Sequence, residues 1–74
     1  MYVFTEKREI VNLDVIAHVY VGECDGVYSV MADGDICLYE SDIKENAMEM
    51  VEQIAKAIDS QKPMFWIGEF AMPF

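Results

Sequence analysis

A row of carboxylates is the clearest chemical feature of the sequence. Acidic residues recur every three to seven positions through one segment of helical period, and they are Asp42, Glu45, Glu49, Glu52 and Asp59. Since a helix rises about 1.5 Å per residue, neighbouring carboxylates would lie about 5–6 Å apart along its axis. Phosphates along one nucleic-acid strand have a comparable separation, so the row could occupy a basic groove made for DNA or RNA. The alternative is an ordinary solvated face that keeps the protein in solution.

The charge balance of the chain also favours a basic partner. Fourteen Asp and Glu residues against five Lys and Arg give a formal net charge of −9. That exceeds the magnitude of about 2–8 that keeps a small domain soluble. Direct binding to DNA, RNA or anionic lipid needs a basic surface and is not expected. A protein partner is expected instead, most concretely a basic nucleic-acid-binding protein.

The other residue types that do chemistry are few and scattered. His18 is the single histidine, and Cys24 and Cys37 are the two cysteines. No serine or cysteine stands in a nucleophile elbow, and no glycine-rich phosphate loop is present. The expected register turns the two cysteines to opposite sheet faces, and His18 lies about 20 Å from Cys24 along one strand. We therefore expect no catalytic residue, no metal site and no cofactor, and the chain is not expected to be an enzyme.

Two Asp-Gly dipeptides divide the middle of the chain into a β-meander. Asp25-Gly26 and Asp33-Gly34 stand between residues of high strand propensity. Asp-Gly supplies the positive φ angles of a two-residue type I′ turn. The predicted strands cover residues 15–24, 27–32 and 35–40, and residues 2–5 and 9–13 are expected to be extended as well.

The sequence then changes to a helical period. The apolar residues that recur at this spacing are Ala47, Val51, Ile54, Ala55 and Ile58. They predict a helix over residues 43–60 that stops before Pro63. Asp42 and Glu45 fit a capping box at its start, with Ser41 as an alternative cap. The expected fold is one α+β domain spanning the chain, an antiparallel meander of four to five strands with an amphipathic helix on one face.

The predicted sheet is apolar on both faces. If both turns hold two residues, one face collects Val15, Ala17, Val19, Val21, Tyr28, Val30, Cys37 and Tyr39. The other face collects Ile16, His18, Tyr20, Cys24, Val27, Met31, Ile36 and Leu38. One helix covers one side only, so the second side needs the C-terminal tail, a second copy of the chain or another partner.

The C-terminal tail holds a group of aromatic residues, which are Phe65, Trp66, Phe70 and Phe74. Such residues anchor interfaces, so the group could be a partner or dimer contact. They could equally complete the core of a domain this small. Residues 64–67 are strand-like and could pair with an open sheet edge.

The chain is expected to be cytoplasmic. Its N-terminal segment has charged residues in place of the apolar stretch of a signal peptide. No uncharged stretch approaches the ~20 residues of a membrane span. Two cysteines are too few for the disulfide framework of a secreted mini-protein.

Several short motifs resemble those of a group of small, mostly uncharacterised proteins of Gram-positive bacteria and their phages. The matching features are residues 11–14, residues 36–39, the stripe formed by Ala47, Val51 and Ile54, and the closing Met72-Pro73. The resemblance implies a meander followed by a helix and an origin in a mobile element. It implies no catalytic residues.

Two functions follow from these features as expectations. The first is a non-enzymatic protein-binding module, most concretely a small acidic, phage-encoded inhibitor that blocks a nucleic-acid-binding protein such as a defence nuclease by mimicking phosphates. The second is a homodimeric structural or accessory domain whose second apolar sheet face is its dimer contact.

Overall fold

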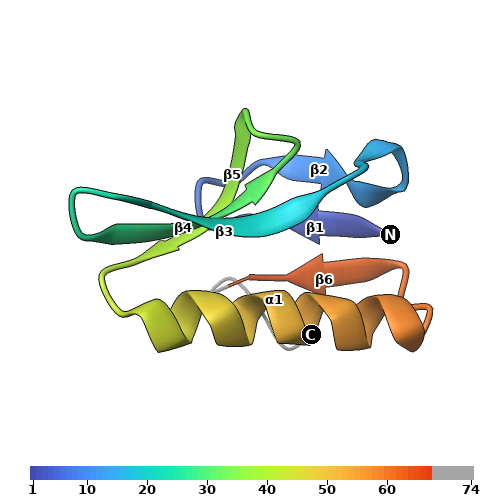
Figure 1. Cartoon of the computed structure of the whole chain (residues 1–74). Helices are drawn as coiled ribbons and strands as arrows, with labels where there is room; N and C mark the ends of the chain where they lie inside the picture. Colours follow the sequence, from blue (N-terminus) through green and yellow to red (C-terminus); the bar gives the residue numbers. More distant parts are fainter. Residues whose placement is uncertain (68–74) are drawn as a thin grey trace.

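The fold belongs to the α+β class, as predicted (Figure 1). The structure is a computed structural model, and it describes residues 1–67 of the 74-residue chain. In chain order the elements are β1 (Tyr2–Phe4), β2 (Ile10–Asn12), the short 3-10 helix η1 (Leu13–Val15), β3 (Val19–Cys24), β4 (Val27–Ala32), β5 (Ile36–Ser41), α1 (Lys44–Asp59) and β6 (Met64–Trp66). The predicted meander and the amphipathic helix are therefore both confirmed.

The described strands form two sheets of three strands, where a single sheet of four to five was predicted. The order β3-β4-β5 is the antiparallel meander, here called sheet B, and the order β2-β1-β6 forms sheet A. In sheet A, β1 pairs antiparallel with β2 and parallel with β6. The strand-like residues at 64–67 thus pair with a sheet edge, but this is the edge of the N-terminal hairpin rather than that of the meander.

The first hairpin of sheet B has the predicted two-residue turn. Cys24 lies opposite Val27, and Asp25 and Gly26 have φ angles of 52° and 81°. The second hairpin differs, because Ala32 lies opposite Ile36 and the turn holds three residues. The condition that both turns hold two residues, which would pair Ala32 with Asp35, therefore fails at the second turn.

A β-bulge at Leu38 shifts the rest of β5. Met31 lies opposite Cys37, but the next residue of β4, Val30, lies opposite Tyr39. Because the three-residue turn shifts β5 by one residue, Leu38 lies on the same side as Val30 and Ala32 and is 1% exposed in the core beside them. The prediction that Leu38 faces away from Val30 was wrong, because a register shift of one residue moves the side chains of a strand to the other face of the sheet.

The start of β3 is also later than predicted, at Val19 instead of residue 15. Asp33 explains this difference. Its carboxylate accepts hydrogen bonds from the backbone N–H groups of Ala17 and His18, both at 3.1 Å. These groups are turned toward the β4–β5 turn, so the chain before Val19 lies outside the strand ladder.

Helix α1 runs one residue inside each predicted end. The predicted capping box of Asp42 and Glu45 is not formed, because the N-cap residue is Ile43 and it has no side-chain cap. The Ser41 hydroxyl instead accepts a hydrogen bond from the backbone N–H of Ile43 at 3.0 Å. A side-chain acceptor outside the first turn thus orients the chain as it enters the helix.

The helix ends in a Schellman motif, which turns the chain toward β6. Lys62 N–H donates to the Ala57 carbonyl at 3.1 Å and Gln61 N–H donates to the Ile58 carbonyl at 2.9 Å. Gln61 has a φ of 57°, in the region that glycine usually fills at this position. The reversal brings residues 64–66 back alongside β1.

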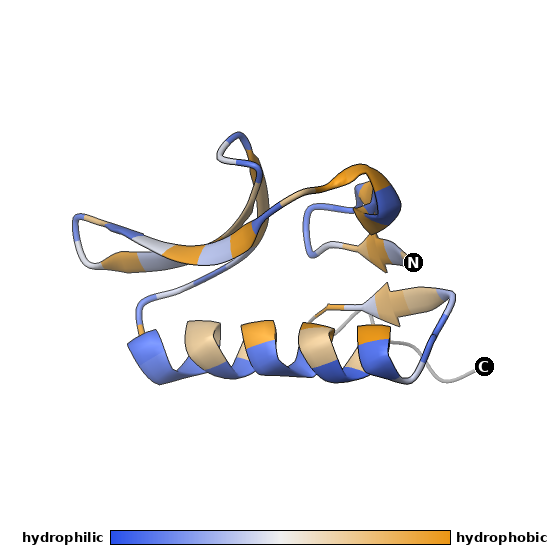
Figure 2. Cartoon of the chain, turned by 45° about the vertical axis from the view of Figure 1, so that its right-hand side comes forward, coloured by the Kyte–Doolittle hydropathy of each residue, from blue (hydrophilic) through white to orange (hydrophobic). Residues whose placement is uncertain are grey.

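The core lies between α1 and the two sheets. Its buried members come from sheet A and its surroundings, from sheet B and from the helix, and they are Val3, Val11, Leu13, Val30, Ala32, Leu38, Ala47, Ile54 and Ile67. Figure 2 shows the apolar side of the helix turned toward the strands and its polar side turned away. Of the predicted stripe, Ala55 is exposed and Ile58 is 53% exposed, whereas Ala57 is buried. The helix is therefore rotated relative to the predicted stripe.

Candidate functional site: an acidic helix face

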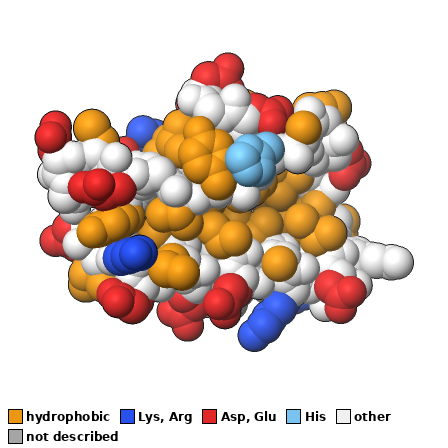
Figure 3. All heavy atoms as spheres, in the orientation of Figure 1, with side chains coloured by type: hydrophobic (Ala, Val, Ile, Leu, Met, Phe, Trp, Pro, Cys, Tyr) orange, Lys and Arg blue, Asp and Glu red, His pale blue; other side chains and the backbone are white. Residues whose placement is uncertain are grey.

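The predicted acidic residues all lie on or just before α1, and all are exposed. Glu45, Glu49, Glu52 and Asp59 are within the helix, and Asp42 precedes it. Because successive residues turn by about 100°, Glu45, Glu49 and Glu52 lie on the side opposite Ala47 and Ile54. Burial of those two residues fixes the rotation of the helix, so packing against the sheets presents the carboxylates outward. In Figure 3 acidic side chains follow the lower edge of the molecule, along the helix.

The charge of this face is not neutralised within the described residues. Glu45, Glu49 and Glu52 make no ion pair in residues 1–67. Lys56 lies four residues after Glu52, at a spacing that allows pairing, but no ion pair joins them. A row of exposed, unpaired carboxylates on a rigid helix can accept charge-assisted hydrogen bonds from Arg and Lys of another molecule.

The row also has a cost for the helix. Glu45 and Glu49 are four residues apart, and Glu49 and Glu52 are three apart. Each such like-charge pair destabilises a helix by roughly 0.2–0.5 kcal/mol. The sequence therefore carries a charge pattern that works against the stability of its own helix.

The predicted aromatic group is only partly within the described residues. Phe65 and Trp66 are half-buried in β6. Phe65 packs against the core, and the ring of Trp66 lies 4.8 Å from that of Phe4 at an interplanar angle of 56°. Phe70 and Phe74 lie outside the described residues. The two described aromatic residues thus belong to the packing of sheet A rather than to the acidic face.

The outer face of sheet B is a smaller apolar surface than predicted. Ile16 and Ile36 pack against the core, and Leu38 is part of it. The outer face is the side of sheet B opposite Val30 and Ala32. Its apolar, aromatic and sulfur-containing residues outside the core cluster are His18, Tyr20, Cys24, Val27, Met31 and Cys37, with Gly22 and Ser29 among them. The His18 ring stacks on that of Tyr20, with centroids 4.8 Å apart. In Figure 3 the histidine, in pale blue, borders an orange hydrophobic cluster.

The two cysteines share this face, which corrects the prediction that they point to opposite faces. Pairing places Cys24 opposite Val27 and Cys37 opposite Met31, on the same side of β4. The correction follows from the three-residue turn, which shifts β5 by one residue. Four residues of β4 separate the two positions, or about 13 Å along the strand. Both cysteines are free thiols, and residues 1–67 contain no cluster of three or more His, Cys, Asp or Glu side chains that could hold a metal ion.

The two thiols are expected to react at different rates. Burial raises the pKa of the Cys37 thiol above its ordinary value, and the nearby Glu40 carboxylate raises it further. A raised pKa leaves less thiolate at a given pH, and the thiolate is the nucleophile. At pH 8 we expect iodoacetamide to modify exposed Cys24 several-fold faster than Cys37, measured by mass spectrometry of peptides over time. Denatured protein should show equal rates, and faster labelling of Cys37 in the folded protein would contradict this expectation.

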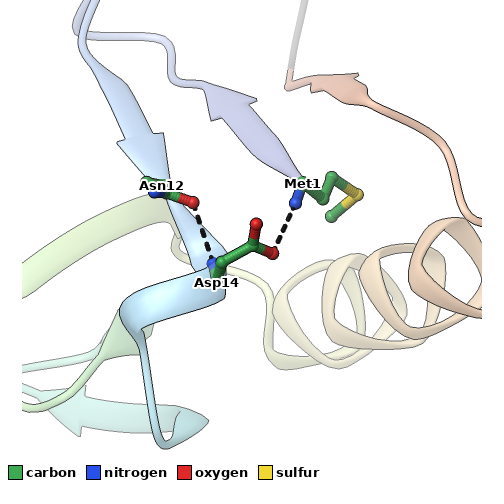
Figure 4. Close-up of polar contacts among 3 residues, drawn as sticks. All are labelled: Met1, Asn12 and Asp14. Carbon is green, nitrogen blue, oxygen red and sulfur yellow. Dashed lines mark hydrogen bonds and ion pairs between the residues drawn. The ribbon is translucent and has the colours of Figure 1, made fainter.

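A hollow at the N-terminal end of the chain was not predicted. It encloses about 400 Å³ and is lined by Met1, Leu13, Asp14, Ile58, Gln61, Lys62 and Pro63. Asp14 pairs with the Met1 amine at 2.7 Å, and its backbone N–H donates to the Asn12 side chain at 3.0 Å (Figure 4). The Asn-x-Asp spacing was the local signal for this arrangement. These contacts fasten η1 to the start of β1.

The fold and the exposed residues together define a small acidic α+β domain that presents a charged helix face. Compared with known proteins, the chain matches no family model, and no curated protein or solved structure is similar to it at a significant level. Among the described residues no helix has the length and apolar character to cross a membrane.

Proposed function

We propose that this chain is a non-enzymatic protein-binding module that docks its acidic helix face on a basic protein. In its most concrete form it is a small, phage-encoded inhibitor that occupies the nucleic-acid groove of a defence nuclease or a similar protein. The observation that supports this most directly is the exposed, unpaired row of Glu45, Glu49 and Glu52 on a rigid helix.

Two physical features favour a binding role over a solvated face. The helix is held by buried Ala47, Ile54 and Ala57, so the carboxylates are presented without the cost of ordering a loop. The like-charge spacing weakens the helix, and a face used only for solubility could include more lysines at no such cost. A complementary basic groove would relieve the repulsion and speed association by electrostatic steering.

The test is displacement of a labelled DNA duplex from a panel of basic DNA-binding proteins and nucleases, measured by fluorescence anisotropy. The unmodified chain is expected to displace DNA from at least one of them, and increasing salt should weaken the effect. E45Q/E49Q/E52Q should reduce the affinity about 10- to 100-fold, at about 0.5–1 kcal/mol for each charge. The variant should be as stable as the original chain or slightly more so, because it removes the like-charge pairs.

A matched control removes three charges elsewhere. Glu6, Glu9 and Asp35 are exposed and lie outside the helix, so E6Q/E9Q/D35N should change the affinity less than threefold. Equal losses in the two triple variants would mean that only the net charge matters. Undiminished binding by E45Q/E49Q/E52Q would rule out the acidic face as the contact.

The second candidate function is a homodimeric structural or accessory domain that uses the outer face of sheet B as its contact. The half-buried row of Tyr20, Met31 and Cys37 favours it, because these residues are outside the core cluster. Met31→Glu would place a charge in such a contact and should halve the apparent mass if this candidate is right. Under either function we place the protein in the cytoplasm, where the thiols of Cys24 and Cys37 would remain reduced.

A further inference from the structure

Strand β3 is an open edge of sheet B. It lies at one end of the order β3-β4-β5, and no strand within residues 1–67 pairs with its other side. The backbone groups that point to the unpaired side of β3 can be identified from one hydrogen bond. The His18 carbonyl accepts from Asp33 N–H at 2.8 Å, so residue 18 points its backbone toward the β4 side. Because backbone groups alternate along a strand, Val19, Val21 and Glu23 direct their N–H and C=O groups to the open side.

The two edges of sheet B are protected very differently. Edge strand β5 is bulged at Leu38, and the turn containing Glu6 and Lys7 lies against residues 37–40. Bulges and covering loops are devices by which proteins prevent pairing at an edge. Strand β3 has no bulge, and it contains no lysine and no proline. Its single charge, Glu23, lies next to the turn.

One flank of α1 with exposed apolar side chains lies below this edge, and Lys44 stands at its start. Met48 and Ile58 are 48% and 53% exposed, although both are large and apolar. Figure 3 shows hydrophobic side chains in a band between the helix and β3, interrupted at the left by a Lys or Arg side chain, with the acidic side chains below them. The opposite flank is polar, since Gln53 and Ser60 border a hollow beside Phe65. The exposed apolar flank and the open edge therefore lie on the same side of the molecule.

We propose that two copies of this chain pair antiparallel through β3, about a two-fold axis at Val21, so that their meanders form one continuous sheet. Reciprocal N–H···O bonds then join Val21 to Val21 of the second copy, and Val19 to its Glu23. The apolar flanks of the two helices face each other beneath the joined edges. This contact goes beyond the proposed function, because it leaves the acidic faces of both helices exposed.

The positions of the charges favour a second copy in this orientation. Antiparallel pairing about Val21 separates the two Glu23 carboxylates by four residues, or about 14 Å along the strands, which exceeds the Debye length of about 8 Å at physiological salt. A parallel arrangement would place them side by side. The remaining repulsion comes from the net charge of −9 on each copy, and salt screens it. Dimerisation should therefore strengthen with salt, whereas binding through the acidic face should weaken.

The test combines mass measurement with amide exchange. By light scattering the apparent mass should rise toward twice 8.5 kDa as concentration increases, and more readily at 0.5 M than at 0.05 M NaCl. In the dimer, hydrogen exchange at the amides of Val19, Val21 and Glu23 should slow at least tenfold. A monomer at every concentration overturns the proposal. A mass that doubles without slower exchange at these amides also overturns it. Slow exchange at these amides in a protein that stays monomeric would overturn it too, because the chain would then cover its own β3 edge.

Two variants separate the contact from the fold. Val21→Pro removes an amide that points away from β4, so it should abolish dimerisation while the circular dichroism spectrum is retained. If this variant fails to fold, M48E/I58E tests the contact instead, because it places charges on the apolar flank. We expect M48E/I58E to weaken the dimer at least tenfold. Q53E/S60E adds the same charge to the other flank and should leave the dimer unchanged. A folded Val21→Pro variant that still dimerises, or equal effects of the two helix variants, would overturn the proposal.

Discussion

Replacing Ile67 by alanine is expected to lower the free energy of unfolding by about 2–5 kcal/mol. Ile67 is 0% exposed and belongs to the core cluster that joins the sheets and the helix. Its backbone N–H also donates to the Phe4 carbonyl at 3.0 Å, which continues the pairing of β6 with β1. A chain of this size has a total stability of about 4–11 kcal/mol, so the loss would be a large part of it. Urea unfolding followed by circular dichroism measures the change.

The matched control is the same substitution at an exposed isoleucine. Ile58 is 53% exposed on the flank of α1, so Ile58→Ala should cost less than about 1 kcal/mol. Comparable losses at the two positions would mean that residue 67 is not a core residue. The comparison also bears on the aromatic residues next to it, because Phe65 and Trp66 are held in the same strand.

Replacing Asp33 by alanine is expected to cost about 2–3 kcal/mol, although the residue is exposed. Its carboxylate accepts from the N–H groups of Ala17 and His18, both at 3.1 Å. Hydrogen bonds to a charged group contribute about 1.5–3 kcal/mol each, and solvent exposure reduces that value here. Asp33 also has a φ of 56°, which aspartate tolerates better than alanine. Asp33→Asn keeps one acceptor and the same backbone preference, so it should recover about half of the loss.

Asp25 provides the control, because it occupies the equivalent turn of the first hairpin. Its φ is 52°, close to that of Asp33, and it also precedes a glycine. Its carboxylate accepts no backbone hydrogen bond within the described residues, and its nearest polar contact is the Cys24 thiol at 3.8 Å. Asp25→Ala therefore isolates the backbone cost, which should be about 1 kcal/mol. Similar losses at the two turns would mean that the carboxylate bonds of Asp33 contribute nothing.

Features of the fold that depend on neighbouring residues could be predicted from the sequence. The turn at Asp25-Gly26 was correct because Asp-Gly supplies both positive φ angles locally. The helix was correct to within one residue at each end, since its apolar period and its stop before Pro63 are local signals. The exposed acidic face follows from that same period, because residues that alternate with a buried stripe must point outward.

In the candidate site, too, features set by neighbouring residues were predictable and features set by distant residues were not. The exposure of Glu45, Glu49 and Glu52 was predictable, but their lack of ion pairs was not, because Lys56 has the spacing to pair and does not. The open edge of β3 was also not predictable. It depends on which strands lie beside the meander, and the sequence allowed residues 64–67 to pair with any open edge.

By itself, the sequence determined an acidic α+β chain with a meander, one helix and a charged helix face. Only the tertiary structure decided that the second turn holds three residues, that this turn brings Leu38 into the core and that β6 joins β1 in a second sheet. The physical reason is the distance along the chain over which each feature is stabilised. Turns and helices depend on contacts within about four residues. The second turn depends on hydrogen bonds that the Asp33 carboxylate accepts from Ala17 and His18, which precede it by 16 and 15 positions. Strand β6 depends on pairing with β1 at the other end of the chain.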